Sequence, residues 1–309
     1  MYDYSQKNRI LFHFLETLKK KNAKIFLSTH QEENVRYSKT SDAIARTSRF
    51  LREAYVDHVF FKTIRPYKST TVDLDILILG GKKSYEDSVK AMKKAGYKLV
   101  VQGPMSTTFW DSEADIGIDL YTEIAASFVI YMDKQKLLKH ITNTKLPNGE
   151  YVRTFRPEVD LACIIAHSII KEQMYLLSEY YTFIHYLEKI SLEDFLRVVR
   201  QNNITSATRA HASITLLLHI YAHNSVPDKL ERIVSHLGRD SFETARLVQN
   251  RFKTPHKYHP VTFIRSFLEI TKGKKAKKSI ANQICHFFDL DFSRDLLKRT
   301  IDHIVRGTY

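Results

Sequence analysis

The 309-residue sequence is poor in the residues that cross-link, break or loosen a chain. It contains two cysteines, seven prolines and nine glycines. Two cysteines exclude a disulfide-rich scaffold, and so few prolines and glycines exclude a collagen-like or low-complexity chain. Hydrophobic residues make up 43% and charged residues 27% of the sequence. This composition is that of an ordinary globular protein, with enough chain for one large or two ordinary domains.

Long hydrophobic runs are also missing. No stretch approaches the roughly 20 apolar residues that a membrane-spanning helix needs. The opening residues, MYDYSQK, lack the apolar core of a signal peptide. Cys163 and Cys285 stand among apolar residues without the spacing of metal ligands, so we interpret them as buried free thiols in a reducing compartment. We expect a cytoplasmic protein with no membrane partner.

Acidic residues are in short supply relative to basic ones. Asp and Glu number 34 against 48 Lys and Arg, which leaves a formal net charge of +14. Such a surplus favours polyanionic partners such as RNA, DNA or nucleotides. A lysine-rich surface of the kind found in thermophiles explains it equally well. The basic run KGKKAKK at 272–278 fits either interpretation, because charge runs are commonly solvated loops.

Against this background, the segment TTVDLDILILGG at 70–81 places two carboxylates in an otherwise apolar strand. Side chains alternate along a strand, so Asp73 and Asp75 share one face with Leu77, and Leu74 and Ile76 share the other. Both faces become apolar within a few residues, which predicts a strand covered on both sides. Neighbouring carboxylates repel each other, so we expect a cation beside them.

A third acid, Asp119, lies in a second apolar β segment, IGIDLY at 116–121. If this strand pairs beside 72–79, three carboxylates converge. Carboxylate oxygens are preferred ligands of Mg²⁺ and suit Mn²⁺, and such a set can hold one ion or share two. In the alternative interpretation, Asp73 caps a turn, Asp75 pairs with a lysine, and Asp119 is exposed at a sheet edge.

A basic and hydroxyl-rich connector precedes the two aspartates. A triphosphate chelated to Mg²⁺ needs both positive charge and hydrogen-bond donors. We therefore predict that an NTP is bound here by Lys62, Arg65, Lys68, Ser69 and Thr70. The alternative is an ordinary solvated loop.

The patterns of hydrophobic residues divide the chain into three parts. These are an N-terminal helical segment at 1–55, an α/β domain at 56–155 and a helical domain at 156–309. The sequence thus predicts an α+β fold, a mixed sheet with flanking helices followed by an all-helical C-terminal domain. Among the individual elements, we expect a short strand at 25–27 and helices at 4–21, 41–54, 158–177 and 293–306.

The unit Ser69-x-x-x-Asp73-x-Asp75, followed by Asp119 on a later strand, resembles the polymerase-beta-like nucleotidyltransferase superfamily. Over about residues 56–185, the chain looks like the minimal and toxin-type nucleotidyltransferases of bacteria and archaea. The resemblance implies that all three aspartates are catalytic and bind metal, and that Ser69 and its neighbours contact the triphosphate. It also implies a nucleotide-binding lysine on the helix that Arg156-Pro157-Glu158 opens, which is Lys171.

The chain departs from this family at the end of the first strand. The usual Gly-Ser turn, whose backbone amides approach the phosphates, is absent, and the segment from Lys62 to Ser69 stands in its place. Arg65 and Lys68 are able to supply charge where the backbone donors are lost.

The resemblance implies an enzyme that moves a nucleotidyl group from an NTP to a hydroxyl with Mg²⁺ or Mn²⁺. The net charge of +14 favours RNA, such as a tRNA, as the acceptor. One alternative is a catalytically decayed domain that binds nucleic acid or regulates another protein. Another is a toxin or antiviral effector with the same chemistry. No protein partner is indicated by the sequence.

Histidines and aromatic residues in the helical half offer weaker signals. His167 and His185 stand on apolar helix faces, where a histidine is usually a satisfied core residue. Trp110, Tyr180 and Tyr181 have the chemistry to stack on a base, but we interpret them as core residues.

Overall fold

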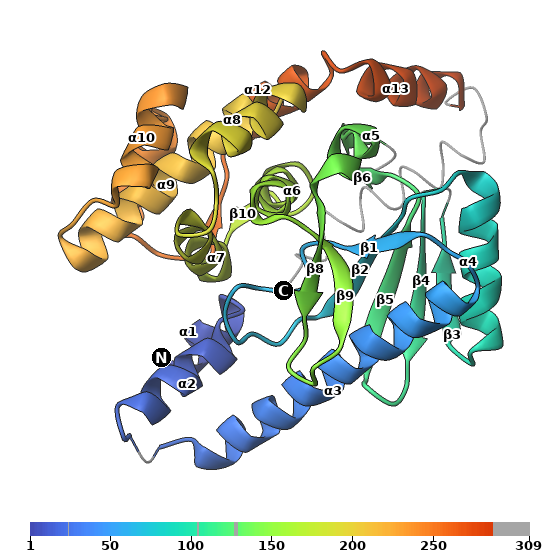
Figure 1. Cartoon of the computed structure of the whole chain (residues 1–309). Coiled ribbons are helices and arrows are strands. Elements are labelled where there is room, and N and C mark those ends of the chain that lie inside the picture. The colour runs from blue at the N-terminus through green and yellow to red at the C-terminus, as the bar shows by residue number, and fades with distance from the viewer. Residues whose placement is uncertain (24, 104, 127–128, 287–309) are drawn as a thin grey trace.

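The computed structural model describes residues 1–286 except 24, 104 and 127–128. A mixed sheet lies at its centre, with helices on both faces (Figure 1). The helix at 157–170 covers one face of this sheet, and most of the helices after it extend away from the sheet. The predicted α+β fold class is confirmed. The predicted helix at 293–306 lies outside the described residues, as does the side chain of Cys285.

The strands of the central sheet are β1 His58–Phe60, β2 Asp73–Ile78, β3 Lys98–Gln102, β4 Ser106–Asp111, β5 Ile116–Tyr121, β8 Ile141–Lys145 and β9 Tyr151–Phe155. Their order across the sheet is β3-β4-β5-β2-β1-β9-β8. Two small sheets pair β6 Ile124–Ala126 with β7 Val129–Met132, and β10 Met174–Tyr175 with β11 His256–Lys257. Strand β2 runs antiparallel to β1 and parallel to β5.

The helices of the N-terminal and α/β parts are α1 Tyr2–Lys7, α2 Leu11–Lys20, α3 Leu27–Glu53, α4 Lys82–Lys94, α5 Lys134–Leu137 and the 3₁₀ helix η1 Leu138–His140. Those of the C-terminal part are α6 Pro157–Ile170, α7 Leu177–Leu187, α8 Leu192–Gln201, α9 Thr205–His223, α10 Asp228–Leu237, α11 Ser241–Gln249, α12 Pro260–Ile270 and α13 Lys274–His286.

Strand β2 is buried on both faces, as its sequence predicts. Leu74, Ile76 and Ile78 pack with residues of α3 and α4 in one apolar cluster. Leu77 belongs to a second cluster, which contains most of α6. Because side chains alternate along a strand, Asp73 and Asp75 lie on the same face as Leu77. Both aspartates are therefore directed to the side of the sheet that α6 covers.

The prediction of a strand at 25–27 is wrong. Helix α3 begins at Leu27, the last residue of this run, and continues to Glu53, so it also includes nearly all of the predicted helix at 41–54. Ile25 and Phe26 are exposed, and the sheet offers them no neighbouring strand. Three apolar residues in sequence favour a strand only when another strand pairs with them.

The predicted single helix at 158–177 is also wrong. Helix α6 ends at Ile170, and the chain turns through Gln173, which has a left-handed φ of +52°. The short strand β10 and helix α7 follow. Apolar periodicity continues through this turn, so the sequence pattern does not reveal it.

Two predictions about individual buried residues have different outcomes. Cys163 is a buried free thiol, as expected. Tyr180 is buried, whereas Trp110 on β4 is 37% exposed and is not a core residue. Among the described residues, none of the helices has both the length and the apolar character needed to cross a membrane.

Candidate active site

The three predicted aspartates converge on adjacent strands. Strands β2 and β5 pair in parallel with Asp75 opposite Asp119 and Asp73 opposite Gly117. One carboxylate oxygen from each of the three aspartates lies within 4.8 Å of the others. The expectation that the strand of Asp119 pairs beside the strand of Asp73 and Asp75 is thereby confirmed. Asp119 is not at a sheet edge, because β4 pairs with the other side of β5.

Burial and mutual repulsion shape the charge of this cluster. Burial, together with the neighbouring Asp75 carboxylate, raises the pKa of Asp73 to about 7. Burial also raises the pKa of Asp119, although Thr108 and Tyr121 donate hydrogen bonds to its carboxylate over 2.5 and 3.2 Å. Among the described residues, no hydrogen bond or ion pair reaches the Asp73 carboxylate. The Asp73 carboxylate therefore has no direct partner among the described residues, although the charges of Lys62 and Lys171 act on it from a distance.

Lys62 supplies positive charge on the side of Asp75. Its Nζ lies 3.2 Å from Asp75 Oδ1, and both side chains are less than a tenth exposed. Burial alone raises the pKa of Asp75, but the ammonium of Lys62, together with His167 and Lys171, outweighs this effect and holds that pKa below its usual value. In the alternative interpretation of the sequence, Asp75 pairs with a lysine. The structure contains this ion pair, and it lies within the cluster that the three aspartates form.

His167 of α6 holds Lys62 in place, a role that sequence reasoning missed. Its Nε2 lies 3.1 Å from Glu172 Oε1, and its Nδ1 lies 3.2 Å from Lys62 Nζ. Burial and the charge of Lys62 lower the pKa of His167 to about 3, so the ring is neutral near pH 7. The tautomer that satisfies both contacts donates from Nε2 to Glu172 and accepts from Lys62 at Nδ1.

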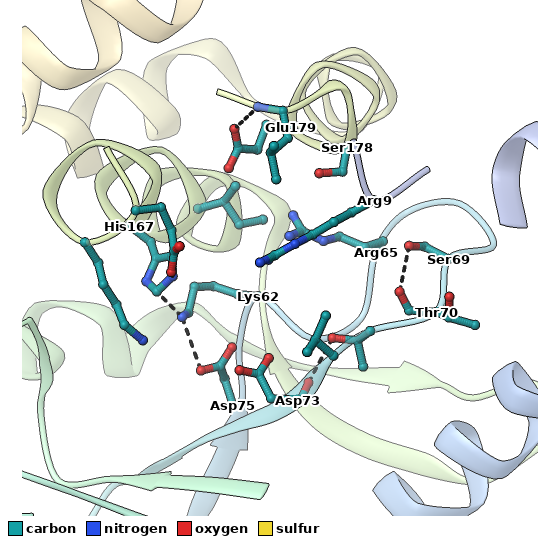
Figure 2. A pocket seen from close by; sticks show the side chains of 16 residues that line it. Arg9, Lys62, Arg65, Ser69, Thr70, Asp73, Asp75, His167, Ser178 and Glu179 are labelled. Carbon is teal, nitrogen blue, oxygen red and sulfur yellow. Dashed lines mark hydrogen bonds and ion pairs between the residues drawn. The ribbon is translucent and has the colours of Figure 1, made fainter. Parts of the chain in front are cut away.

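A cavity of about 110 Å³ lies against Asp73 and Asp75 (Figure 2). Its wall carries the basic residues Arg9, Lys62, Arg65 and Lys171 and the hydroxyl residues Ser69, Thr70, Thr71 and Ser178. Figure 2 shows Arg9 and Arg65 extending into the space across from the two aspartates. Arg9 comes from the turn between α1 and α2, and its sequence context contains no signal for this placement.

The predicted nucleotide contacts do not all reach this cavity. Arg65, Ser69, Thr70 and Lys171 line it with Lys62. Lys171 is the residue that directly follows α6, rather than a residue within that helix. The hydroxyl of Thr70 donates to Glu33 Oε2 of α3 over 2.7 Å, so its side chain already has a protein partner.

Lys68 lies apart from the three aspartates. Its Nζ is 3.1 Å from Glu16 Oε2 of α2, and it lines a second cavity of about 500 Å³. This second cavity lies across the segment 62–68, since Lys62 and Arg65 line both cavities. Its wall adds Lys145 and Lys189 to the basic residues, along with the aromatic residues Tyr37, Phe60, Phe61, Tyr67, Phe155 and Tyr186.

The donor set suits a hard divalent cation. It consists of carboxylate oxygens from three buried or half-buried aspartates, which is the chemistry that Mg²⁺ and Mn²⁺ prefer over sulfur or imidazole ligands. The pKa of Asp73 is raised, and its carboxylate has no hydrogen-bond or ion-pair partner among the described residues. A bound cation would stabilise the ionised form of this carboxylate. Asp73, Asp75 and Asp119 are therefore able to hold such an ion.

Comparison with known proteins adds a distant likeness. No family model matches the chain, and no curated protein matches its sequence. Among solved structures, the chain is similar to a STING-associated CdnE c-di-GMP synthase from Capnocytophaga granulosa, with a TM-score of 0.36 and 12% sequence identity. The alignment covers 91% of this chain and 96% of that protein. A TM-score this low does not establish a common function.

Proposed function

We propose that this protein transfers a nucleotidyl group from an NTP to a hydroxyl acceptor in a reaction that requires Mg²⁺ or Mn²⁺. The observation that supports this proposal is the convergence of three carboxylates on β2 and β5 beside a small cavity with basic and hydroxyl residues. Carboxylates that bind a divalent ion and cations that bind phosphates are the two components that nucleotidyl transfer needs.

Each group of residues has a distinct role in this proposal. Asp73, Asp75 and Asp119 would hold one or two divalent ions, which would stabilise the charge on the attacking and leaving oxygens. Arg65 and Lys171 bind and orient the phosphates from the cavity wall. Ser69 adds a hydroxyl and backbone donors at the same wall. The raised pKa of Asp119 suits it to accept a proton from the acceptor hydroxyl.

We further propose that the acceptor is RNA. The net charge of +14 favours a polyanion. The second cavity is lined by the half-buried rings of Tyr37 and Tyr67 and by five basic residues, Lys62, Arg65, Lys68, Lys145 and Lys189. Basic groups bind the backbone of a single strand and aromatic rings stack on its bases. Arg65 lines both cavities, so an acceptor in the second would lie next to a nucleotide in the first.

The test is incubation with each α-labelled NTP, Mg²⁺ and total cellular RNA. Wild type is compared with Asp119→Asn and with Asp115→Asn, the same change at an exposed aspartate four positions earlier. We expect wild type and Asp115→Asn to label an RNA band and Asp119→Asn to lose more than about 100-fold of that activity. Full activity in Asp119→Asn would refute the assignment of the metal site. Label on protein instead of RNA would refute only the proposal that the acceptor is RNA.

A second candidate function is a decayed domain that binds nucleic acid without catalysis. The observation that favours it is the ion pair of Lys62 with Asp75, which neutralises one of the three carboxylates. This candidate predicts RNA binding that weakens steeply with salt, persists in EDTA and is unchanged in Asp119→Asn. Transfer of label by wild type, or loss of RNA binding in EDTA, would exclude it.

A further inference from the structure

We infer that the ammonium of Lys62 takes the place of a second divalent cation, so that the three aspartates hold a single divalent ion. This inference rests on the proposed function, because it concerns the same carboxylates. It concerns the number of ions, which the proposed function leaves open between one and two. The position of Lys62 is where the chain lacks the Gly-Ser turn of the family that it resembles.

The first argument is that Lys62 already lies where an ion would bind Asp75. Its Nζ is 3.2 Å from Asp75 Oδ1, and the exposed fractions of the two side chains are 6% and 8%. A Mg²⁺ ion binds an oxygen at about 2.0–2.1 Å. An ion on that oxygen would share a water-poor site with the ammonium, and two cations this close repel each other strongly.

The second argument is that the ammonium is held from several directions. His167 Nδ1 accepts from it over 3.2 Å. The ring centres of Phe61 and Tyr121 lie 4.8 and 5.8 Å from Nζ, which places the charge over two aromatic faces. Displacement of Lys62 by an ion would give up all of these contacts together with the ion pair, so Lys62 is a built-in cation rather than a mobile side chain.

The third argument is that the backbone of Lys62 is anchored too. Its N–H donates to Asp160 Oδ1 of α6 over 2.7 Å, and its φ of +61° is left-handed. Residues other than glycine and asparagine adopt this backbone conformation at an energetic cost, so it occurs only where surrounding contacts stabilise it. The conformation directs the side chain of Lys62 between α6 and the aspartates (Figure 2).

Charge balance leads to the same number of ions. Three ionised carboxylates carry a charge of −3 in a mostly buried cluster. One divalent ion and one ammonium supply +3 and neutralise the cluster. Two divalent ions together with Lys62 would leave a buried excess of +2, which is costly unless a ligand compensates it.

The test counts bound Mn²⁺ per chain by electron paramagnetic resonance in a titration with the metal alone, without nucleotide. We expect one ion in wild type and two ions in Lys62→Met, with the broadened spectrum of a pair of neighbouring spins. Methionine is similar in length to lysine and has no charge, so it frees the Asp75 carboxylate and supplies no cation in place of the ammonium. The matched control is Lys171→Met, which removes the same charge from the same cavity but leaves Lys62 on Asp75. It should still bind one ion.

The possible outcomes separate this inference from the proposed function. Two ions in wild type would overturn the inference and leave the proposed function intact. One ion in a folded Lys62→Met, checked by circular dichroism, would also overturn it. If wild type and both variants bind no Mn²⁺, the inference and the metal requirement of the proposed function fail together. The number of Mn²⁺ ions that wild type binds tests the inference even if Lys62→Met does not fold.

Discussion

The two faces of strand β2 have the same backbone and very different chemistry. On the face covered by α3 and α4, Leu74, Ile76 and Ile78 are fully buried among apolar residues. On the face covered by α6, Asp73 and Asp75 lie with Lys62 and His167 before the strand becomes apolar at Leu77. The first face is an ordinary core, whereas the second places charges where burial opposes them.

This difference indicates that the α6 face is not optimised for stability. An apolar side chain on the first face gains free energy from burial without needing a specific partner. A carboxylate on the second face needs a cation at a defined position, and Asp73 has none among the described residues. Substitutions on the two faces should therefore differ in sign as well as in size.

The largest expected effect on stability is that of Asp75→Asn. It leaves the buried ammonium of Lys62 without its carboxylate, which should lower the free energy of unfolding by about 3–5 kcal/mol. Urea unfolding in EDTA measures the change. The double variant Lys62→Met/Asp75→Asn removes both charges and should recover most of the loss. A double variant as unstable as Asp75→Asn would show that the ion pair is not the cause.

On the apolar face, Ile76→Val should cost about 0.5–1.5 kcal/mol in the same urea experiment. The change removes one methylene group from a fully buried side chain, and the closely packed core cannot fill the space completely. Addition of Mn²⁺ should not alter this difference, since Ile76 faces away from the aspartates. A loss that depended on the metal would contradict the separation of the two faces.

Asp73→Asn should have the opposite sign and make the metal-free protein more stable than wild type at pH 8. The pKa of Asp73 is raised from its ordinary 3.8 to about 7 in the folded protein. The folded state therefore binds the proton more tightly, and wild type loses stability as the pH rises from about 4 to about 7. Asparagine lacks this loss, so its advantage should be larger at pH 8 than at pH 5.

Urea unfolding at the two pH values, in EDTA, measures the effect of Asp73→Asn. Asp115→Asn, at an exposed position, is the matched control and should show no such pH dependence. Saturating Mn²⁺ should reverse the order and make wild type the more stable protein, because the ion binds the folded carboxylates. A variant that is less stable than wild type in EDTA at pH 8 would contradict the repulsion at Asp73.

The smallest effect should come from Lys68→Met. Lys68 belongs to the same connector as Lys62, but its side chain is about half exposed and pairs with Glu16. Loss of such a surface pair costs between about 0 and 1 kcal/mol. The Mn²⁺ count should stay at the wild-type value, because Lys68 does not contact the three aspartates. An altered count would show that charge anywhere in the connector, rather than contact with Asp75, controls the metal.

Some features of the site follow from local sequence because local geometry decides them. The alternation of side chains on a strand has a period of two, so the shared face of Asp73 and Asp75 is readable from 70–81. The same rule identifies Asp119 as an acid in an apolar strand. The α+β class follows in the same way, from strands and helices that alternate before a helical half. The turn at Gln173 escaped this reasoning because apolar periodicity continues through it.

Local sequence patterns were enough to identify the acids that share a strand face, a mixed sheet followed by helices, and a charge that suits a polyanion. The pairing of β2 with β5, which sets Asp75 opposite Asp119, emerges only from the folded chain. The folded chain also shows that Lys62 binds Asp75 while Lys68, six positions later, binds Glu16. The reason is that His167 and Asp160, which position Lys62, lie about a hundred residues away on α6, and no local pattern encodes the packing of α6 against this connector.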